Sequence, residues 1–237
     1  MYHRLGSPLV RSIVRGQYVF AWSLYWQIRQ LQTDGYRGIT MRELLSRPEC
    51  ATDHFAITFD DGYRGVWTKA FPVLTALNTP ATIYMVADAI GGTNIWDQRI
   101  GDRVEPMLGL DELRAMAQAG IEIGAHSVHH AHLCALSDIE LQRELVDGKQ
   151  RLEDAIGQTV VSFAYPYGEW DARIRQAVIN AGYQSAVITD RGAYSPQLDP
   201  YAIYRVQMRF NTLGFMLTDK LRSANEITAR AEMRPAG

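Results

Sequence analysis

Two adjacent aspartates are the first residues of this sequence whose types and position suit catalysis. Asp60 and Asp61 directly follow the apolar stretch 55–59. Adjacent carboxylates repel each other, so both remain ionised more easily when a cation neutralises one of them. The pair is followed by Gly62, and Asp-Gly is also a common turn sequence. Taken alone, the pair is therefore equally consistent with a turn and with a functional site.

A dense group of histidines favours the functional interpretation. Four of the six histidines fall between residues 126 and 132. His126 and His130 are four residues apart, so in a helical turn both imidazoles would lie on one face and could bind one metal ion. Two imidazole nitrogens and one aspartate oxygen make a three-ligand site with open positions, which is typical of catalytic zinc. We expect His129 and His132 to point elsewhere.

A third cluster, at residues 162–170, is rich in aromatic side chains. Flat rings can cover the apolar faces of sugars, so this segment predicts a carbohydrate groove, although alone it also suits an ordinary Pro-Tyr-Gly turn. The residues that we expect to contact substrate are Tyr63, Tyr165, Pro166 and Trp170.

The elements that must position these clusters alternate between strand and helix. Apolar, β-rich runs occur at 55–59, 81–86, 121–125, 160–164, 183–188 and 203–208. Helices are predicted over 111–119, 137–157 and 171–181; the second begins with a Ser-x-x-Glu capping box, and each ends at a glycine. Repeated strand–helix units imply parallel strands with helices outside. We predict an α/β fold, a distorted (β/α) barrel with seven rather than eight repeats, formed by one domain over 1–237. The rival, an open doubly wound sheet, would carry a glycine-rich phosphate fingerprint, which is absent.

Composition narrows the functional classes. The chain has 237 residues and a net charge of -2, which argues against nucleic acid as the main partner, and 47% hydrophobic residues, which excludes a disordered chain. Cys50 and Cys134 are too few for a disulfide framework or a cysteine-rich zinc site.

No segment of the sequence predicts a membrane span. The longest charge-free aromatic stretch, 16–28, has 13 residues and is too short to cross a bilayer. Its apolar residues predict a helix that packs on the core through Phe20, Leu24, Ile28 and Leu31. The start of the sequence also shows no secretory signal, which predicts a cytoplasmic protein.

The three clusters, in this order and spacing, resemble the first three motifs of the polysaccharide deacetylases (the NodB-homology domain, carbohydrate esterase family 4). They lie at residues 58–63, 126–130 and 163–168. The resemblance implies a distorted (β/α) barrel that hydrolyses N-acetyl groups of a glycan with one divalent metal ion. Zinc suits the implied ligands best, with iron, cobalt or nickel also compatible. By position, the resemblance assigns metal binding to Asp61, His126 and His130, the general base to Asp60, and an oxyanion-binding N–H to Tyr167.

Two departures from the family pattern affect the predicted site. Many relatives brace the base aspartate with an arginine of the third motif, where this chain has Ala164; Asp190 is one candidate substitute, or a turn residue. Many relatives also supply the general acid from a C-terminal Leu-x-His motif, but no histidine follows His132. Tyr2-His3 resembles the opening of circularly permuted members, such as exopolysaccharide deacetylases. In that branch the first strand replaces the missing last one, which makes His3 the implied acid. Most members of that branch act outside the cytoplasm, so a truncated start and export stay open.

Several functions are compatible with these residues. The lead hypothesis is a metal-dependent N-deacetylase whose partner is an N-acetylated glycan. An amidohydrolase acting on another N-acyl group or on a cyclic amide would use the same metal chemistry. An inactive carbohydrate-binding barrel would be favoured by a disordered His3, and it is disfavoured by the intact set of Asp60, Asp61, His126 and His130. A two-metal phosphoesterase is less favoured, because only one full ligand set is present.

Overall fold

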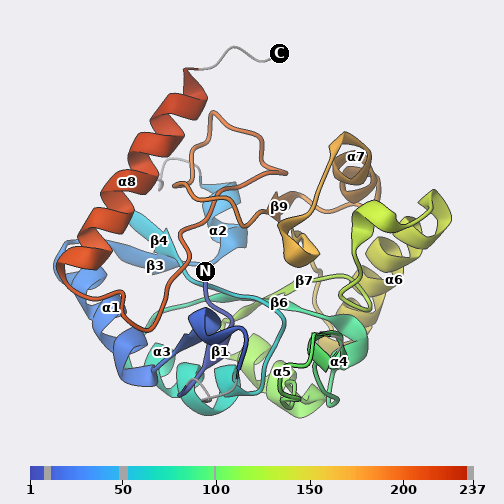
Figure 1. Ribbon diagram of the computed structural model, residues 1–237, viewed down its shortest axis with the longest axis horizontal. Helices are drawn as coiled ribbons and strands as arrows, with labels where there is room; N and C mark the ends of the chain where they lie inside the picture. Colours follow the sequence, from blue (N-terminus) through green and yellow to red (C-terminus); the bar gives the residue numbers. More distant parts are fainter. Residues whose placement is uncertain (8–11, 48–52, 99, 234–237) are drawn as a thin grey trace.

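A computed structural model describes residues 1–7, 12–47, 53–98 and 100–233 of the chain (Figure 1). Its centre is a curled sheet of five parallel strands in sequential order, β5-β6-β7-β8-β9. The strands are Thr58–Phe59 (β5), Thr82–Met85 (β6), Glu122–Ala125 (β7), Ser162–Ala164 (β8) and Ser185–Val187 (β9). Each of them lies within one of the predicted apolar runs, and nearly all of their residues are buried, as parallel strands covered by helices require.

Helices connect these strands and cover the outside of the sheet. They are Phe71–Ala76 (α3), Ile95–Gln98 (α4), Leu110–Gln118 (α5), Asp138–Ile156 (α6) and Ala172–Asn180 (α7). The predicted capping box of α6 is present, because the Ser137 hydroxyl accepts from the N–H of Glu140 and the Glu140 carboxylate accepts from Ser137. The helix ends at Gly157, whose φ of 69° suits glycine. The predictions of α5, α6 and α7 are confirmed within two residues at each end.

The N-terminal part of the chain adds two small parallel sheets. They are formed by Arg4–Leu5 (β1) with Tyr18–Val19 (β2), and by Arg37–Ile39 (β3) with His54–Ala56 (β4). Two helices, Ala21–Thr33 (α1) and Met41–Ser46 (α2), lie between these strands, and Phe215–Glu232 (α8) follows the last strand. As predicted, α1 packs on the core, with Leu24, Ile28 and Leu31 buried. Among the described residues, no helix is both long and apolar enough to span a bilayer. Cys134 is exposed and carries a free thiol, whereas Cys50 lies outside the described residues.

The first residues of the chain complete the sheet beside β5. Tyr2 forms a parallel bridge with Phe59, and its backbone exchanges hydrogen bonds with Thr58 and Asp60 at 2.8 and 2.9 Å. On its other side, the nitrogen and carbonyl of Met1 bond to Val206 and Met208. The predicted placement of the N-terminal segment in the position of a last strand is therefore confirmed.

The prediction of a strand over 203–208 is wrong. This segment makes only an isolated parallel bridge, between Ile203 and Val187. Its remaining backbone hydrogen bonds go to different segments, since Arg205 bonds to Asp190 and Met208 to Met1. Because its hydrogen-bond partners are divided between the region of β9 and the N-terminus, the segment forms no continuous ladder of backbone hydrogen bonds with either.

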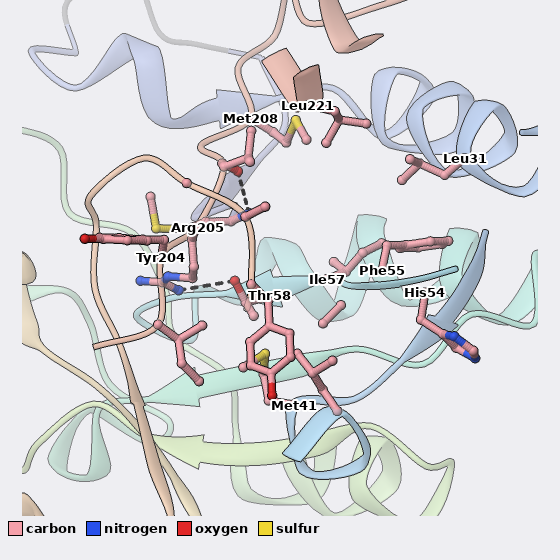
Figure 2. Close-up of a pocket in the computed structure, with 18 of the residues that line it drawn as sticks. Leu31, Met41, His54, Phe55, Ile57, Thr58, Tyr204, Arg205, Met208 and Leu221 are labelled. Atoms are coloured by element: carbon pink, nitrogen blue, oxygen red, sulfur yellow. Dashed lines mark hydrogen bonds between the residues drawn. The ribbon is translucent and has the colours of Figure 1, made fainter. Parts of the chain in front are cut away.

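The sheet is a half-barrel rather than a closed ring of seven repeats. A cavity with a volume of about 450 Å³ lies beside the N-terminal segment. Phe55 and Ile57 line one side of it, and Tyr204 and Arg205 line the other (Figure 2). Leu221 of α8 covers it from above. The described strands form one sheet of five and two sheets of two, so the seven-repeat count is not confirmed.

A buried arginine ties the N-terminal segment to the loop that follows α4. The guanidinium of Arg4, which is fully buried, bonds to the carboxylates of Asp97, Asp102 and Glu105 at 2.6, 3.0 and 3.1 Å. It also donates to the hydroxyls of Tyr18 and Tyr63 at 2.9 Å each.

We expect Arg4→Met to destabilise the fold by about 3–5 kcal/mol, because it leaves partly buried carboxylates without their cation. Urea unfolding followed by circular dichroism measures the loss. Arg222→Met is the matched control, since Arg222 is exposed and pairs only with Asp219 on the surface; we expect it to change stability by less than about 1 kcal/mol. Equal unfolding midpoints for Arg4→Met and the parent would contradict the structural role of the cluster.

Candidate active site

Three of the predicted residues form a compact cluster at the carboxyl ends of β5 and β7. Nε2 of His126 and Nε2 of His130 lie 3.2 and 3.4 Å from Oδ1 of Asp61. All three side chains are buried, and their ligand atoms lie within 4.8 Å of one another. Burial alone would raise the pKa of Asp61, but hydrogen bonds from the two imidazoles hold it well below its ordinary value. The cluster brings one carboxylate and two imidazoles to a single point.

The segment that carries the histidines is not the helical turn that the spacing predicted. Ser127 and His130 have positive φ values of 64° and 56°. Both residues therefore adopt the left-handed backbone conformation, which a right-handed helical turn does not contain. The Ser127 hydroxyl accepts from the N–H of His130 at 2.9 Å, and the Glu144 carboxylate accepts from the N–H groups of Val128 and His129. These side-chain acceptors replace the hydrogen bonds of a helix and stabilise a turn that also brings the two imidazoles together.

The remaining two histidines of the group point away from the cluster, as predicted. His129 and His132 are more than half exposed and lie beside the carboxylates of Glu144 and Glu169. The His132 ring stacks on the ring of Tyr167, with centroids 3.9 Å apart.

The orientation of the clustered imidazoles suits a metal ion. Nδ1 of His126 lies 2.7 Å from the carbonyl of Ala164 and can donate to it, so a bound ion would take the place of the proton on Nε2. The His130 ring lies between Trp96 and Tyr167, at centroid distances of 4.7 and 4.5 Å, which fixes its plane. Two oriented imidazole nitrogens and a carboxylate oxygen are a donor set that fits zinc and related divalent ions.

The brace of Asp60 comes from a residue that the sequence did not reveal. Arg205 donates to both carboxylate oxygens of Asp60, at 2.6 and 2.7 Å, and also to the carbonyl of Ile188 at 2.9 Å. Burial alone would raise the pKa of Asp60, but the facing guanidinium lowers it below its ordinary value. Asp190, the candidate substitute, is exposed, and only its backbone carbonyl contacts Arg205.

His3 also lies beside Asp60. Its Nε2 is 3.8 Å from Oδ2 of Asp60, and its side chain is 13% exposed. Burial lowers the pKa of His3, while the nearby charges of Asp61 and Asp60 oppose that effect. The pairing of Tyr2 with β5 places His3 at the site.

A groove opens beside the cluster, and its lining includes none of the four residues that were predicted to contact substrate. It has a volume of about 710 Å³ and includes Trp96, His130, His132 and Tyr167 in its lining. Tyr167 has a φ of 60° and an exposed ring, so it faces this groove.

The prediction that Tyr63, Tyr165 and Pro166 contact substrate is not supported by their positions. All three are buried. The Tyr63 hydroxyl bonds to Asp97, and the Tyr165 hydroxyl bonds to the carbonyl of Tyr201. Trp170 is half-buried and stacks on Tyr165 at 6.0 Å. These residues, although adjacent to the predicted catalytic motifs, pack in the core. The sequence alone does not show whether an aromatic residue beside such a motif lies in the core or in a substrate groove.

A sequence comparison decides the family. Residues 49–186 match the family model for polysaccharide deacetylases. The chain belongs to the polysaccharide deacetylase family. It is therefore a member of a family of hydrolases, and the recognition from the three motifs is confirmed.

Individual relatives agree with this assignment. YxkH of Bacillus subtilis, a protein assigned to the polysaccharide deacetylases, is 29% identical over 88% of this chain and 70% of its own length. A poly-β-1,6-N-acetyl-D-glucosamine N-deacetylase of Staphylococcus epidermidis is 23% identical over 76% of this chain and 64% of its own length. The fold is similar to that of the deacetylase PplD of Streptococcus pyogenes, with a TM-score of 0.81, 21% identity and coverage of 93% and 96% of the two chains.

Proposed function

We propose that this chain is a metal-dependent hydrolase that removes N-acetyl groups from N-acetylhexosamine units of a polysaccharide and releases acetate. The observation that carries the proposal is the position of Asp60, which is held by Arg205, lies 3.8 Å from His3 and directly precedes Asp61 of the Asp61–His126–His130 cluster. A base, an acid and a metal-binding set are the groups that hydrolysis of an amide requires. The name of the Staphylococcus epidermidis relative supports an N-acetylglucosamine polymer as substrate.

Each residue of the site would have a separate role in this reaction. Asp61, His126 and His130 would hold one divalent ion, for which zinc is the preferred choice. When bound, the ion lowers the pKa of water and polarises the acetamide carbonyl. Asp60, kept ionised by Arg205, would accept a proton from the attacking water.

The remaining steps would fall to His3 and to Tyr167. His3 would donate a proton to the departing amine. The backbone N–H of Tyr167 would stabilise the oxyanion that forms as water adds to the carbonyl. The position of Tyr167 supports this role, because its ring lies 4.5 Å from the ring of His130 and its backbone has a φ of 60°.

The two alternatives differ from this proposal in what they require of the site. An inactive carbohydrate-binding barrel has no need of an acid beside Asp60, yet His3 lies 3.8 Å from it. An amidohydrolase acting on a formyl or cyclic amide would use the same residues and would differ only in the groove.

Acetate release from N-acetylglucosamine oligomers tests the proposal. We expect release by protein reloaded with zinc, and loss of release after the metal is removed with a chelator. Zinc uptake is measured separately, by calorimetry. Zinc binding without acetate release, together with turnover of formylated or cyclic amides, would assign the alternative amidohydrolase. Release that persists in metal-free protein would overturn the metal dependence.

A further inference from the structure

Four aromatic side chains are exposed on α1 and on the segment that leads into α8. Trp22 and Trp26 of α1 are 53% and 59% exposed, and Phe210 and Phe215 are 43% and 78% exposed. Large rings left in water forgo the free energy that their burial would contribute, so a group of them indicates an interaction surface. We refer to Trp22, Trp26, Phe210 and Phe215 as the aromatic face.

Hydrogen bonds show that the two segments of the aromatic face lie side by side. Ser23, Gln27 and Gln30 of α1 donate to the carbonyls of Phe210, Thr212 and Gly214 respectively. The segment 210–214 therefore runs along α1, next to the stripe that carries Trp22 and Trp26 one helical turn apart. Figure 1 shows the beginning of α8 beside α1.

Positive charge predominates around the aromatic face. Residues 12–33 and 200–218 contain no aspartate or glutamate. Three exposed arginines belong to these segments: Arg15 precedes α1, Arg29 lies one turn after Trp26, and Arg209 directly precedes Phe210. The acidic residues that directly follow the two segments are Asp34, which is exposed at the end of α1, and Asp219, which pairs with Arg222 at 2.7 Å. A surface of this composition is complementary to an anionic partner.

We propose that the aromatic face binds the surface of an anionic lipid bilayer. Tryptophan rings settle at the boundary between headgroups and acyl chains, phenylalanine adds apolar area, and arginine interacts with the phosphates of anionic lipids. The exposed arginines outnumber the exposed aspartates beside this face, which favours a uniformly anionic surface over a protein surface of mixed charge. The catalytic groove is lined by residues of α4 and of the 129–136 segment, which lie across the molecule from α1 in Figure 1. Binding through the aromatic face would thus leave the groove open to the surrounding solution.

Flotation of the full chain with lipid vesicles tests the proposal. We use vesicles of phosphatidylcholine alone and vesicles with equal parts of phosphatidylcholine and phosphatidylserine. We expect binding to the second kind, weakened by added salt, and a shift of tryptophan fluorescence to shorter wavelength on binding. Trp22→Gln with Trp26→Gln is expected to bind roughly tenfold more weakly, because two interfacial rings are lost. Acetate release in solution should be unchanged in this variant, since neither residue lies near the catalytic cluster.

Ile139→Gln is the matched control. Ile139 is 66% exposed on α6, on the side of the molecule opposite to α1, and its replacement should leave vesicle binding unchanged. Equal binding by the parent and the double tryptophan variant would overturn the proposal. Concentration-dependent dimerisation that the tryptophan replacements abolish, without vesicle binding by the parent, would assign the face to a second copy of the chain and overturn it as well.

Discussion

Replacement of Asp60 by asparagine is expected to lower kcat for acetate release by about 10²- to 10⁴-fold, the usual contribution of a general base. Asparagine preserves the size of the side chain but cannot accept the proton of the attacking water. Asp60 does not belong to the group that could hold a metal ion, which is formed by Asp61, His126 and His130. Zinc affinity should therefore remain close to that of the parent.

Two measurements separate this role from a metal-binding one. Calorimetric titration with zinc measures the affinity of the Asp61–His126–His130 cluster for the ion. Initial rates of acetate release measure the contribution of the general base. Asp190→Asn is the matched control, because Asp190 is exposed and contacts Arg205 only through its backbone; its rate should stay within about twofold of the parent, as expected for a surface substitution. If Asp60→Asn retained the parent's rate, another group would have to be the base.

The sequence predicted those parts of the fold whose signals are local. The capping box at Ser137, the terminal Gly157 and the apolar spacing in α1 each act over a few residues, and the structure confirms all three elements. The Asp61–His126–His130 cluster was also predictable, because its residues directly follow apolar runs that become β5 and β7. Parallel strands bring their carboxyl ends to one edge, so residues 65 positions apart meet there.

The parts that the sequence did not predict depend on distant contacts. Arg205 is 145 positions from Asp60, and its only local signal was a single arginine within an apolar run. The burial of Tyr63 depends on Arg4 and Asp97, which belong to separate segments. The turn at 126–130 was mistaken for a helical one because non-glycine residues rarely adopt positive φ, and here the acceptors of Ser127 and Glu144 stabilise it.

Replacement of Arg205 by methionine is expected to lower kcat by about 10²-fold, through the misplacement of Asp60 rather than through any contact with substrate. The guanidinium holds both oxygens of Asp60, and it is itself fixed by Ile188 and Thr58. Methionine retains much of the apolar volume but leaves the Asp60 charge buried and unpaired, so we also expect a loss of stability of about 3–5 kcal/mol. Arg205→Lys keeps the charge but cannot reproduce the two parallel hydrogen bonds, and it should recover only part of the rate.

A double-variant cycle shows whether Arg205 acts through Asp60. If it does, Asp60→Asn combined with Arg205→Met should be no slower than Asp60→Asn alone, because the second change disturbs a base that is already absent. The double variant should also be more stable than Arg205→Met, since it removes the unpaired buried charge. Acetate release and urea unfolding measure the two effects on the same four proteins. Rate losses that multiply would instead show that Arg205 contributes to catalysis independently of Asp60, and its position at the base would then need another explanation.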